Sequence, residues 1–195
     1  EYVLINTADP AEIDNLRSDH RFAPINYIHG DYIDERVLNR ANLKEAARVI
    51  VFADRMIQGS IQEVDSRTVI TVITIKSISK TIYTCAELLD EKFERYLRFS
   101  NCDEIIMSTE YNRSIIANAS AGSGISQVIS ELLSVNADVS ISTQEIPARF
   151  IGKTFGDLFD FYLARNRTIL IGILENTGNF YTRKTEAIRD AQKTP

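Results

Sequence analysis

The sequence predicts an α/β protein built on a doubly wound parallel sheet, and two observations lead to this prediction. First, short apolar runs alternate with segments whose apolar residues recur every three to four positions, as strands alternate with helices in such a fold. Second, residues 26–54 contain a complete strand, helix, strand unit in which Gly30 permits a sharp turn after the first strand. The second strand of this unit, residues 48–53 (RVIVFA), is apolar without alternation. Such a strand is buried on both faces, which favours the middle of a parallel sheet.

Five strands and their intervening helices are expected in the first half of the chain. The predicted strands are residues 2–6, 25–28, 48–53, 80–85 and 104–107. Helices are predicted at residues 11–17 and 90–99, and a further helix is expected to begin at Asp31. Asp34 follows Asp31 by three residues, so that both carboxylates complement the positive end of that helix.

Residues 65–77 (DSRTVITVITIKS) are ambiguous by composition, because β-branched residues favour a strand. However, Thr68, Thr71 and Thr74 recur every three residues, a spacing that a strand does not produce. We therefore predict an amphipathic helix, with Asp65 or Ser66 as its N-cap.

The chain changes character after the fifth predicted strand. Residues 110–137 contain two helical stretches separated by AGSG (121–124), where two glycines predict a break. The apolar stripe on these stretches must pack against the chain's own sheet or against a neighbouring subunit, and we expect self-association. The predicted subunit interface contains Ile115, Ile116, Ala119, Ile125, Val128, Ile129, Leu132 and Leu133.

Residues 138–195 are expected to form a small α+β lobe. We predict strands at 139–143 and 167–174, a helix at 153–164, a hairpin turn at 175–179 and a return strand at 180–183. Residues 186–193 are polar and are either a helix or a tail. The predicted division is therefore an N-terminal lobe (1–109), crossover helices (110–137) and a C-terminal lobe (138–195).

Composition excludes several classes of protein. The net charge of −5, with 44% hydrophobic and 25% charged residues, describes a soluble globular domain and argues against a nucleic-acid partner, which needs a basic face. The sequence shows neither a signal-peptide pattern nor an apolar run of the roughly 18 residues that a membrane span needs. Cys85 and Cys102 are expected to be reduced and to behave as small hydrophobic residues.

Candidate ligand-binding residues follow the predicted strands, because a doubly wound sheet binds its ligands beyond the carboxyl ends of its strands. Neither a G-x-G-x-x-G turn nor a phosphate-binding loop is present, and no catalytic base, nucleophile or zinc cluster stands out, so we expect no enzyme. The candidates for nucleotide or ion binding are Asn6, Asp9, His29, Asp31, Asp54, Arg55, Glu87 and Asp90. Of the carboxylates, Glu87, Asp90 and Glu91 could bind a hard cation, although helix capping explains the same residues at a helix start.

The phrases IHGDYIDERVLNRANLKEAARVIVFAD, DSRTVITVITIKSISKTIYTCAEL and CDEIIMSTEY resemble the RCK family (regulators of K+ conductance, with TrkA-N and TrkA-C domains). The resemblance rests on linked spacing: Gly30 and Asp31, the following apolar positions, the apolar strand, and Asp103 before the last strand. It implies a Rossmann-like lobe, crossover helices that pair subunits, and a small C-terminal lobe. In this family, eight domains form a gating ring beneath a transmembrane potassium pore, at the cytoplasmic face of the membrane.

The resemblance also implies a function and partners. The expected function is that of a ligand-sensing gating-ring domain of a potassium channel; the alternatives are a soluble nucleotide-binding subunit of a potassium transporter or an NAD-dependent oxidoreductase domain. Candidate ligands are Ca2+ or another cation, ADP, ATP and NAD. In this alignment residues 2–6 correspond to the family's second strand, so its first strand and helix are expected from another polypeptide or fragment.

Particular residues gain expected roles from the same resemblance. Asn6 stands where nucleotide-binding relatives carry an acidic residue that holds the ribose, and Asp31 stands near the adenine or ribose position. Glu87 matches a carboxylate of calcium-gated members, whereas Met56 and Leu89 stand where further carboxylates are needed. The resemblance therefore leaves the choice between a nucleotide and a cation open.

Overall fold

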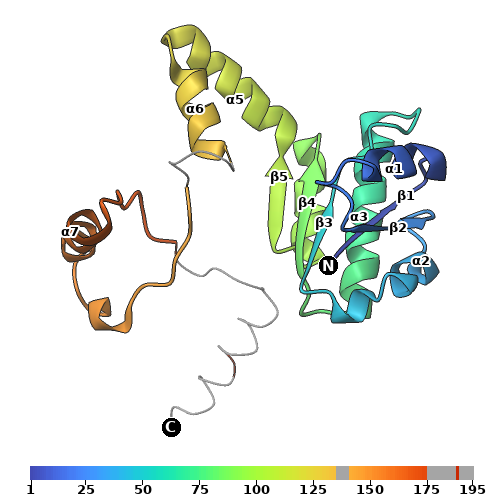
Figure 1. Ribbon diagram of the computed structural model, residues 1–195, viewed down its shortest axis with the longest axis horizontal. Coiled ribbons are helices and arrows are strands. Elements are labelled where there is room, and N and C mark those ends of the chain that lie inside the picture. The colour runs from blue at the N-terminus through green and yellow to red at the C-terminus, as the bar shows by residue number, and fades with distance from the viewer. Residues whose placement is uncertain (135–140, 175–187, 189–195) are drawn as a thin grey trace. The chain divides into compact units, whose positions relative to one another are not determined.

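The computed structural model describes residues 1–134, 141–174 and 188, and the chain divides into two compact units. Residues 1–113 belong to the first unit and the described residues between 114 and 174 to the second. The three-part division at residues 109 and 137 stays a prediction. Figure 1 shows the two units, which we describe separately.

Strands and helices alternate through the first unit, which confirms the predicted α/β class. In chain order the elements are β1 (Tyr2–Asn6), α1 (Pro10–Arg17), β2 (Ile25–His29), α2 (Glu35–Arg40), the 3-10 turn η1 (Leu43–Glu45), β3 (Arg48–Val51), α3 (Ile61–Ile78), β4 (Tyr83–Leu88), the 3-10 turn η2 (Glu91–Phe93), α4 (Glu94–Phe99) and β5 (Glu104–Met107). Helix α5 (Ser108–Ala121) begins in this unit and continues into the second.

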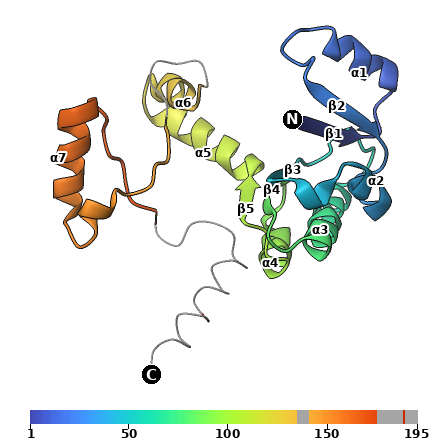
Figure 2. The same ribbon diagram turned by 60° about the horizontal axis from the view of Figure 1, so that its bottom comes forward.

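Every strand pair in the described part of the chain is parallel, but the strands form two sheets instead of one. Strands β1 and β2 pair with each other, and β3, β4 and β5 form a separate three-stranded sheet in that order. Figure 2 shows β1 and β2 side by side, with α1 beside them.

The buried central position predicted for residues 48–53 is therefore not found among the described residues. Strand β3 has β4 as its only neighbour among the described residues and lies at the edge of its sheet. Val51 is buried under a helix, but Ile50 and Phe52 remain 61% and 68% exposed. The strand is apolar on both faces, and within the described residues only one of these faces is covered.

Helix α3 covers the face of the three-stranded sheet on which Val51 lies (Figures 1 and 2). The predicted helix is confirmed over residues 65–77, but it begins earlier, with Ser60 as the N-cap: the Ser60 hydroxyl accepts the backbone N–H of Glu63 at 3.2 Å. The predicted cap at Asp65 or Ser66 is wrong, because both residues lie inside the helix. The hydroxyls of Thr68, Thr71 and Thr74 donate to carbonyls four residues earlier, so the helix satisfies its own polar groups.

Packing of α3 against the sheet makes the main core of the first unit. Val72 and Ile75 of α3, Ala86 and Leu88 of β4 and Leu97 of α4 are all fully buried. The core also contains Leu38, Leu43, Val51, Val69, Ile82 and Met107, with Ile5 of β1 packed against it. This burial explains why β-branched residues form a helix here: tertiary packing outweighs local preference.

A buried ion pair fixes the last part of α3 to the amino end of the sheet. Lys76 Nζ lies 2.7 Å from Asp103 Oδ2, and the two side chains are only 6% and 0% exposed. Lys76 also donates to the Ile82 carbonyl at 2.7 Å, and Asp103 Oδ2 accepts the backbone N–H of Thr84 at 2.7 Å. Both charges are thus hydrogen-bonded, as burial requires.

Several predicted boundaries are corrected. The helix expected from Asp31 begins at Glu35, because Asp34 is its N-cap and accepts the backbone N–H of Arg36 at 2.8 Å. The carboxylate of Asp31 instead accepts the backbone N–H of Ile33 within the preceding turn. The strand predicted at residues 80–85 is β4 (Tyr83–Leu88), and the helix predicted at 90–99 consists of η2 followed by α4.

The second unit contains the remainder of α5, helix α6 (Ile125–Leu133), the 3-10 turn η3 (Ala148–Phe150) and α7 (Phe155–Asn166). The predicted break between α5 and α6 is confirmed: Gly124 has a φ of 88°, which disfavours other residues. Helix α7 begins with a capping box between Thr154 and Asp157, and its Leu158 is buried. The rings of Phe150 and Phe161 pack with centroids 5.0 Å apart.

The strands predicted in the C-terminal lobe are not found where the structure describes this region. Residues 141–143 and 168–174 have no regular secondary structure. Ile169, Ile171 and Ile173 are 68%, 73% and 43% exposed, because no neighbouring strand is present among the described residues to pair with this segment. Residues 139 and 140, the turn at 175–179, the strand at 180–183 and the segment 186–193 fall outside the described residues, except Ile188.

The buried pair between Lys76 and Asp103 generates a stability prediction. The variant Asp103→Asn leaves the Lys76 ammonium buried without its counter-charge, so it is expected to lower the free energy of unfolding by about 3–5 kcal/mol. Urea unfolding of the variant and the wild type measures this difference.

The matched control is Arg36→Gln, which breaks the Arg36–Asp34 pair at the same distance of 2.7 Å. Arg36 is 90% exposed, so this change is expected to cost no more than about 1 kcal/mol. Equal losses in the two variants would contradict the energetic importance of the buried pair.

Candidate functional site

Three groups of polar side chains lie at the carboxyl ends of the strands, which we call the carboxyl edge. In the first, the Arg67 cluster, Arg67 Nη2 donates to Asp31 Oδ1 at 2.8 Å and Arg67 Nε donates to the Tyr32 hydroxyl at 3.4 Å. The Tyr32 hydroxyl donates to Asp54 Oδ2 at 3.2 Å. The bond from Tyr32 to Asp54 thus joins the loops after β2 and β3, and Arg67 of α3 holds the loop after β2.

Hydrogen bonds in the Arg67 cluster outweigh the effect of burial on the arginine, and burial keeps Tyr32 protonated. The Arg67 guanidinium lies 5.2 Å from the centre of the Tyr32 ring, a cation–π distance. The hydrogen bond from Arg67 to Tyr32 raises the arginine pKa, with a further contribution from Asp31, so Arg67 stays charged. Burial raises the pKa of the Tyr32 hydroxyl, which therefore stays protonated and able to donate to Asp54.

The second group, the Glu87 cluster, lies where β3 and β4 end. Glu87 Oε2 accepts the backbone N–H of Ala53 at 3.1 Å, and Glu87 Oε1 accepts from Arg55 Nη2 at 3.3 Å. Arg55 Nη2 also lies 3.4 Å from the Ser108 hydroxyl at the start of α5. Both carboxylate oxygens of Glu87 are therefore in use, and any cation bound here replaces Arg55 as the partner.

The third group lies at the ends of β1 and β2. The Tyr27 hydroxyl is 3.0 Å from Asn6 Oδ1 and 2.8 Å from the Ala8 carbonyl, and His29 Nδ1 is 3.1 Å from the same carbonyl. The Asn6 side chain also accepts the backbone N–H of Ala8 at 3.1 Å. Asn6 and His29, predicted as site residues, are thus brought together by Tyr27, while Asp9 serves as the N-cap of α1.

The three carboxylates proposed for a cation do not form a cluster. Asp90 Oδ1 caps η2 by accepting the backbone N–H of Lys92 at 3.0 Å, and Glu91 is exposed within η2. Glu87 is held by Ala53 and Arg55. Across residues 1–134, 141–174 and 188, no group of three or more His, Cys, Asp and Glu side chains could hold a metal ion. The geometry gives the cation site no support, and it stays a prediction.

Asp65 is a polar residue at the carboxyl edge whose role the sequence did not reveal. Its side chain is fully buried, Oδ1 accepts the backbone N–H of Leu89 at 3.0 Å, and Oδ2 accepts that of Asp90 at 2.8 Å. Burial raises the pKa of this carboxyl group, although the two backbone donors act in the opposite direction. The signal available in the sequence was a carboxylate in line with the buried positions of α3, such as Val69 and Val72.

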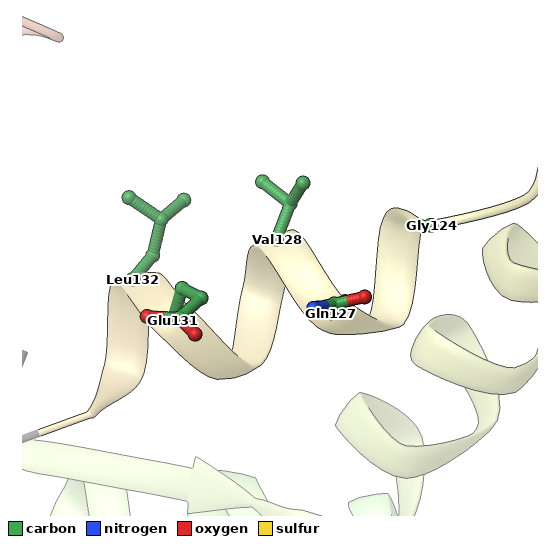
Figure 3. A pocket seen from close by; sticks show the side chains of 5 residues that line it. All are labelled: Gly124, Gln127, Val128, Glu131 and Leu132. Carbon is green, nitrogen blue, oxygen red and sulfur yellow. The ribbon is translucent and has the colours of Figure 1, made fainter.

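The apolar residues predicted to form a subunit interface lie on α5 and α6, and several are open to solvent. Ile116, Val128 and Leu133 are 69%, 59% and 67% exposed. Figure 3 shows Val128 and Leu132 pointing from the same side of α6, where they line a shallow hollow with Gly124, Gln127 and Glu131. A second hollow brings Ile115 of α5 together with Ile129 and Leu133 of α6.

Cys85 and Cys102 are predicted to be reduced and to behave as small hydrophobic residues. Cys85 and Cys102 are both free thiols; burial raises the pKa of Cys85 and raises that of Cys102 to about 12. Both are therefore protonated near neutral pH, as expected for small hydrophobic residues.

None of the helices in the described part of the chain combines the length and hydropathy needed to span a membrane.

Comparison with known proteins places these features in a family context. The chain has a Rossmann-like α/β lobe with charged groups at its carboxyl edge, which is where doubly wound domains bind their ligands. Residues 2–86 match the model of the calcium-activated potassium channel slowpoke-like RCK domain. The predicted resemblance to the RCK family is thus confirmed over this part of the chain.

Curated relatives and a solved structure agree with this match. The chain is 23% identical to the calcium-gated potassium channel TvoK of Thermoplasma volcanium over 146 residues, which are 74% of this chain and 42% of that protein. It is 24% identical to the putative potassium channel protein YugO of Bacillus subtilis over 155 residues, 79% of this chain and 46% of that protein. The chain thus spans less than half the length of these relatives. The human SLO3 gating ring shares its fold, with a TM-score of 0.61 and 16% identity over 84% of this chain and 33% of that chain.

Proposed function

We propose that this chain is a ligand-sensing regulatory domain of a potassium channel, located at the cytoplasmic face of the membrane. The observation that carries this proposal is the RCK match over residues 2–86, which includes the whole Arg67 cluster together with Ala53 and Arg55 and ends one residue before Glu87. Relatives named as potassium channels support it. In such a domain the output is a difference in binding free energy between two shapes of the assembly, and no bond is broken.

The proposed ligand site is the carboxyl edge between the loops that follow β2, β3 and β4. Residues 53–55 connect the two clusters there: Asp54 accepts from Tyr32, while Ala53 and Arg55 both donate to Glu87. A ligand that replaces Arg55 at Glu87, or Arg67 at Asp31, therefore changes contacts on both sides of this loop. Since Arg55 also lies near Ser108, the change reaches the first turn of α5.

Regulation fits the side chains of this edge better than catalysis does. Burial raises the pKa of both thiols, so Cys85 and Cys102 are protonated near neutral pH and neither is poised as a nucleophile. The oxidoreductase alternative would need a nicotinamide cofactor and a hydride-accepting substrate. The soluble transporter subunit differs from our proposal only in lacking a covalent link to a pore.

The two sheets of the first unit support a further part of the proposal, a strand supplied from elsewhere. Within the described residues, β1 and β3 each have one edge without a neighbouring strand. A parallel strand between them would pair both edges and produce a single sheet in the order β2, β1, inserted strand, β3, β4, β5. A helix following that strand would cover the exposed Ile50 and Phe52. We propose that another segment of the full-length protein, or a separate polypeptide, supplies this strand and helix.

Assembly is the last part of the proposal. Exposed apolar residues on α5 and α6, such as Ile116 and Val128, suit an interface with a second copy of the domain. Dimers of this kind would build an octameric ring attached to a transmembrane pore.

Ligand binding is tested by thermal unfolding of the full-length protein with Ca2+, ADP, ATP and NAD supplied separately. A ligand that binds only the native state stabilises it by about 2.7 kcal/mol at a concentration 100-fold above Kd, so at least one of the four is expected to raise the unfolding midpoint by several degrees. Glu87→Gln is expected to reduce that increase by removing the charge of the cluster.

The control for this experiment is Glu45→Gln, which changes an exposed carboxylate in η1 that is not among the candidate site residues. Its unfolding midpoint is expected to rise with ligand as much as that of the wild type. If none of the four compounds shifts the midpoint of the wild type, the ligand-sensing proposal is wrong.

Self-association through α5 and α6 is tested by light scattering with multi-angle detection. The double variant Ile116→Asp, Val128→Asp places charges on the apolar surface and is expected to halve the molar mass of a dimer. Asn118→Asp is the matched control, because Asn118 is exposed on α5 but lies about 200° around the helix from Ile116. A wild-type protein that is strictly monomeric would refute the interface.

A further inference from the structure

The amino-terminal half of α3 reaches two loops of the carboxyl edge from opposite sides of the helix. Asp65 and Arg67 are two residues apart, so they point about 200° away from each other. Asp65 accepts the backbone N–H groups of Leu89 and Asp90, directly after β4. Arg67 contacts Asp31 and Tyr32, directly after β2. One helix thus sets the positions of both loops.

The contact of Asp65 is the more constrained of the two. Its carboxylate is fully buried and both oxygens are used, whereas Arg67 keeps 26% of its side-chain surface exposed. Leu88, the last residue of β4, is also fully buried. The end of β4 is therefore held by the packing of the Leu88 side chain and by the hydrogen bonds to the backbone that follows it. Hydrogen bonds that involve a charged acceptor are the stronger kind.

Glu87 lies at this same end of β4. Its carboxylate faces away from the helix-covered side, since Thr84, Ala86 and Leu88 are the buried residues of the strand and alternate with it. Its two oxygens reach Ala53 and Arg55 only if the end of β4 stays beside the end of β3. The turn held by Asp65 begins two residues after Glu87.

We propose that Asp65 is a positioning residue of the carboxyl-edge site, which holds the backbone of Leu89 and Asp90 and thereby keeps the Glu87 carboxylate against Ala53 and Arg55. Asp65 does not touch the ligand; it sets the geometry of a residue that does. Its effect on ligand affinity rests on the function proposed above, but its effect on Glu87 does not.

Hydrogen–deuterium exchange of the full-length protein tests the effect on Glu87. In Asp65→Asn, the side chain keeps its size but offers one acceptor oxygen instead of two. The exchange rates of the backbone N–H groups of Leu89, Asp90 and Ala53 are all expected to rise roughly tenfold. Ala53 is the decisive reporter, because it contacts Glu87 and not Asp65.

Asp103→Asn is the matched control, because it also removes a charge from a buried carboxylate that accepts a backbone N–H, but at the amino end of the sheet. Its Ala53 exchange is expected to stay within about twofold of the wild type after correction for global stability. A second variant, Asp65→Glu, retains both acceptor oxygens and is expected to restore part of the protection at Ala53. It also serves as the test variant if Asp65→Asn does not fold.

The outcomes distinguish the positioning role of Asp65 from the ligand-binding function proposed above. Faster exchange at Leu89 and Asp90 with no change at Ala53 would show that Asp65 stabilises only its own turn, and would overturn the positioning role. Calorimetric titration with Ca2+ and with ADP is expected to give about tenfold weaker binding of either probe in Asp65→Asn than in Asp103→Asn. If the wild type binds none of Ca2+, ADP, ATP and NAD, the proposed function fails, and exchange at Ala53 alone decides the role of Asp65.

Discussion

Helix α3 is fixed to the three-stranded sheet by buried carboxylates near both of its ends, and the arrangement of the first unit depends on these contacts. Near its start, Asp65 accepts two backbone N–H groups after β4; near its end, Lys76 pairs with Asp103 before β5. Between them, Val72 and Ile75 are fully buried against the sheet. Apolar burial supplies most of the stabilisation, whereas the polar contacts fix the position of the helix along its axis, because each buried charge must keep its partners.

The same helix relates the two sheets to each other. Arg67 contacts the loop after β2, while Asp65 contacts the turn after β4, so the candidate ligand site lies between two loops that one helix positions. Ligand binding at this edge shifts the equilibrium between two conformations of the domain only if the position of one loop relative to the other differs between them. The Arg55 side chain, close to both Glu87 and Ser108, then connects such a movement to α5. The regulation proposed above thus has a physical route through Arg55.

The sequence predicted those features that depend on local patterns. The order of strands and helices follows from periodicity, and the spacing of Thr68, Thr71 and Thr74 identified α3 in spite of its β-branched residues. The role of Asp65 was missed because its partners, Leu89 and Asp90, lie 24 and 25 residues away and only the fold brings them together. Arg67 was missed for the same reason.

Features that need a neighbour outside the local segment were predicted less well. Residues 168–174 have the composition of a strand, but an extended segment becomes a strand only when another one pairs with it. Strand β3 has the composition of a central strand and lies at an edge. In both cases the segment has the apolar composition of a buried strand, but no other part of the chain that the structure describes covers it.

A structure of the full-length protein, determined by cryo-electron microscopy, tests this account most directly. We predict that it contains a strand between β1 and β3, parallel to both, which joins the two sheets into one and is followed by a helix over Ile50 and Phe52. Direct pairing of β1 with β3, or a full-length protein in which the two sheets remain separate, would contradict it.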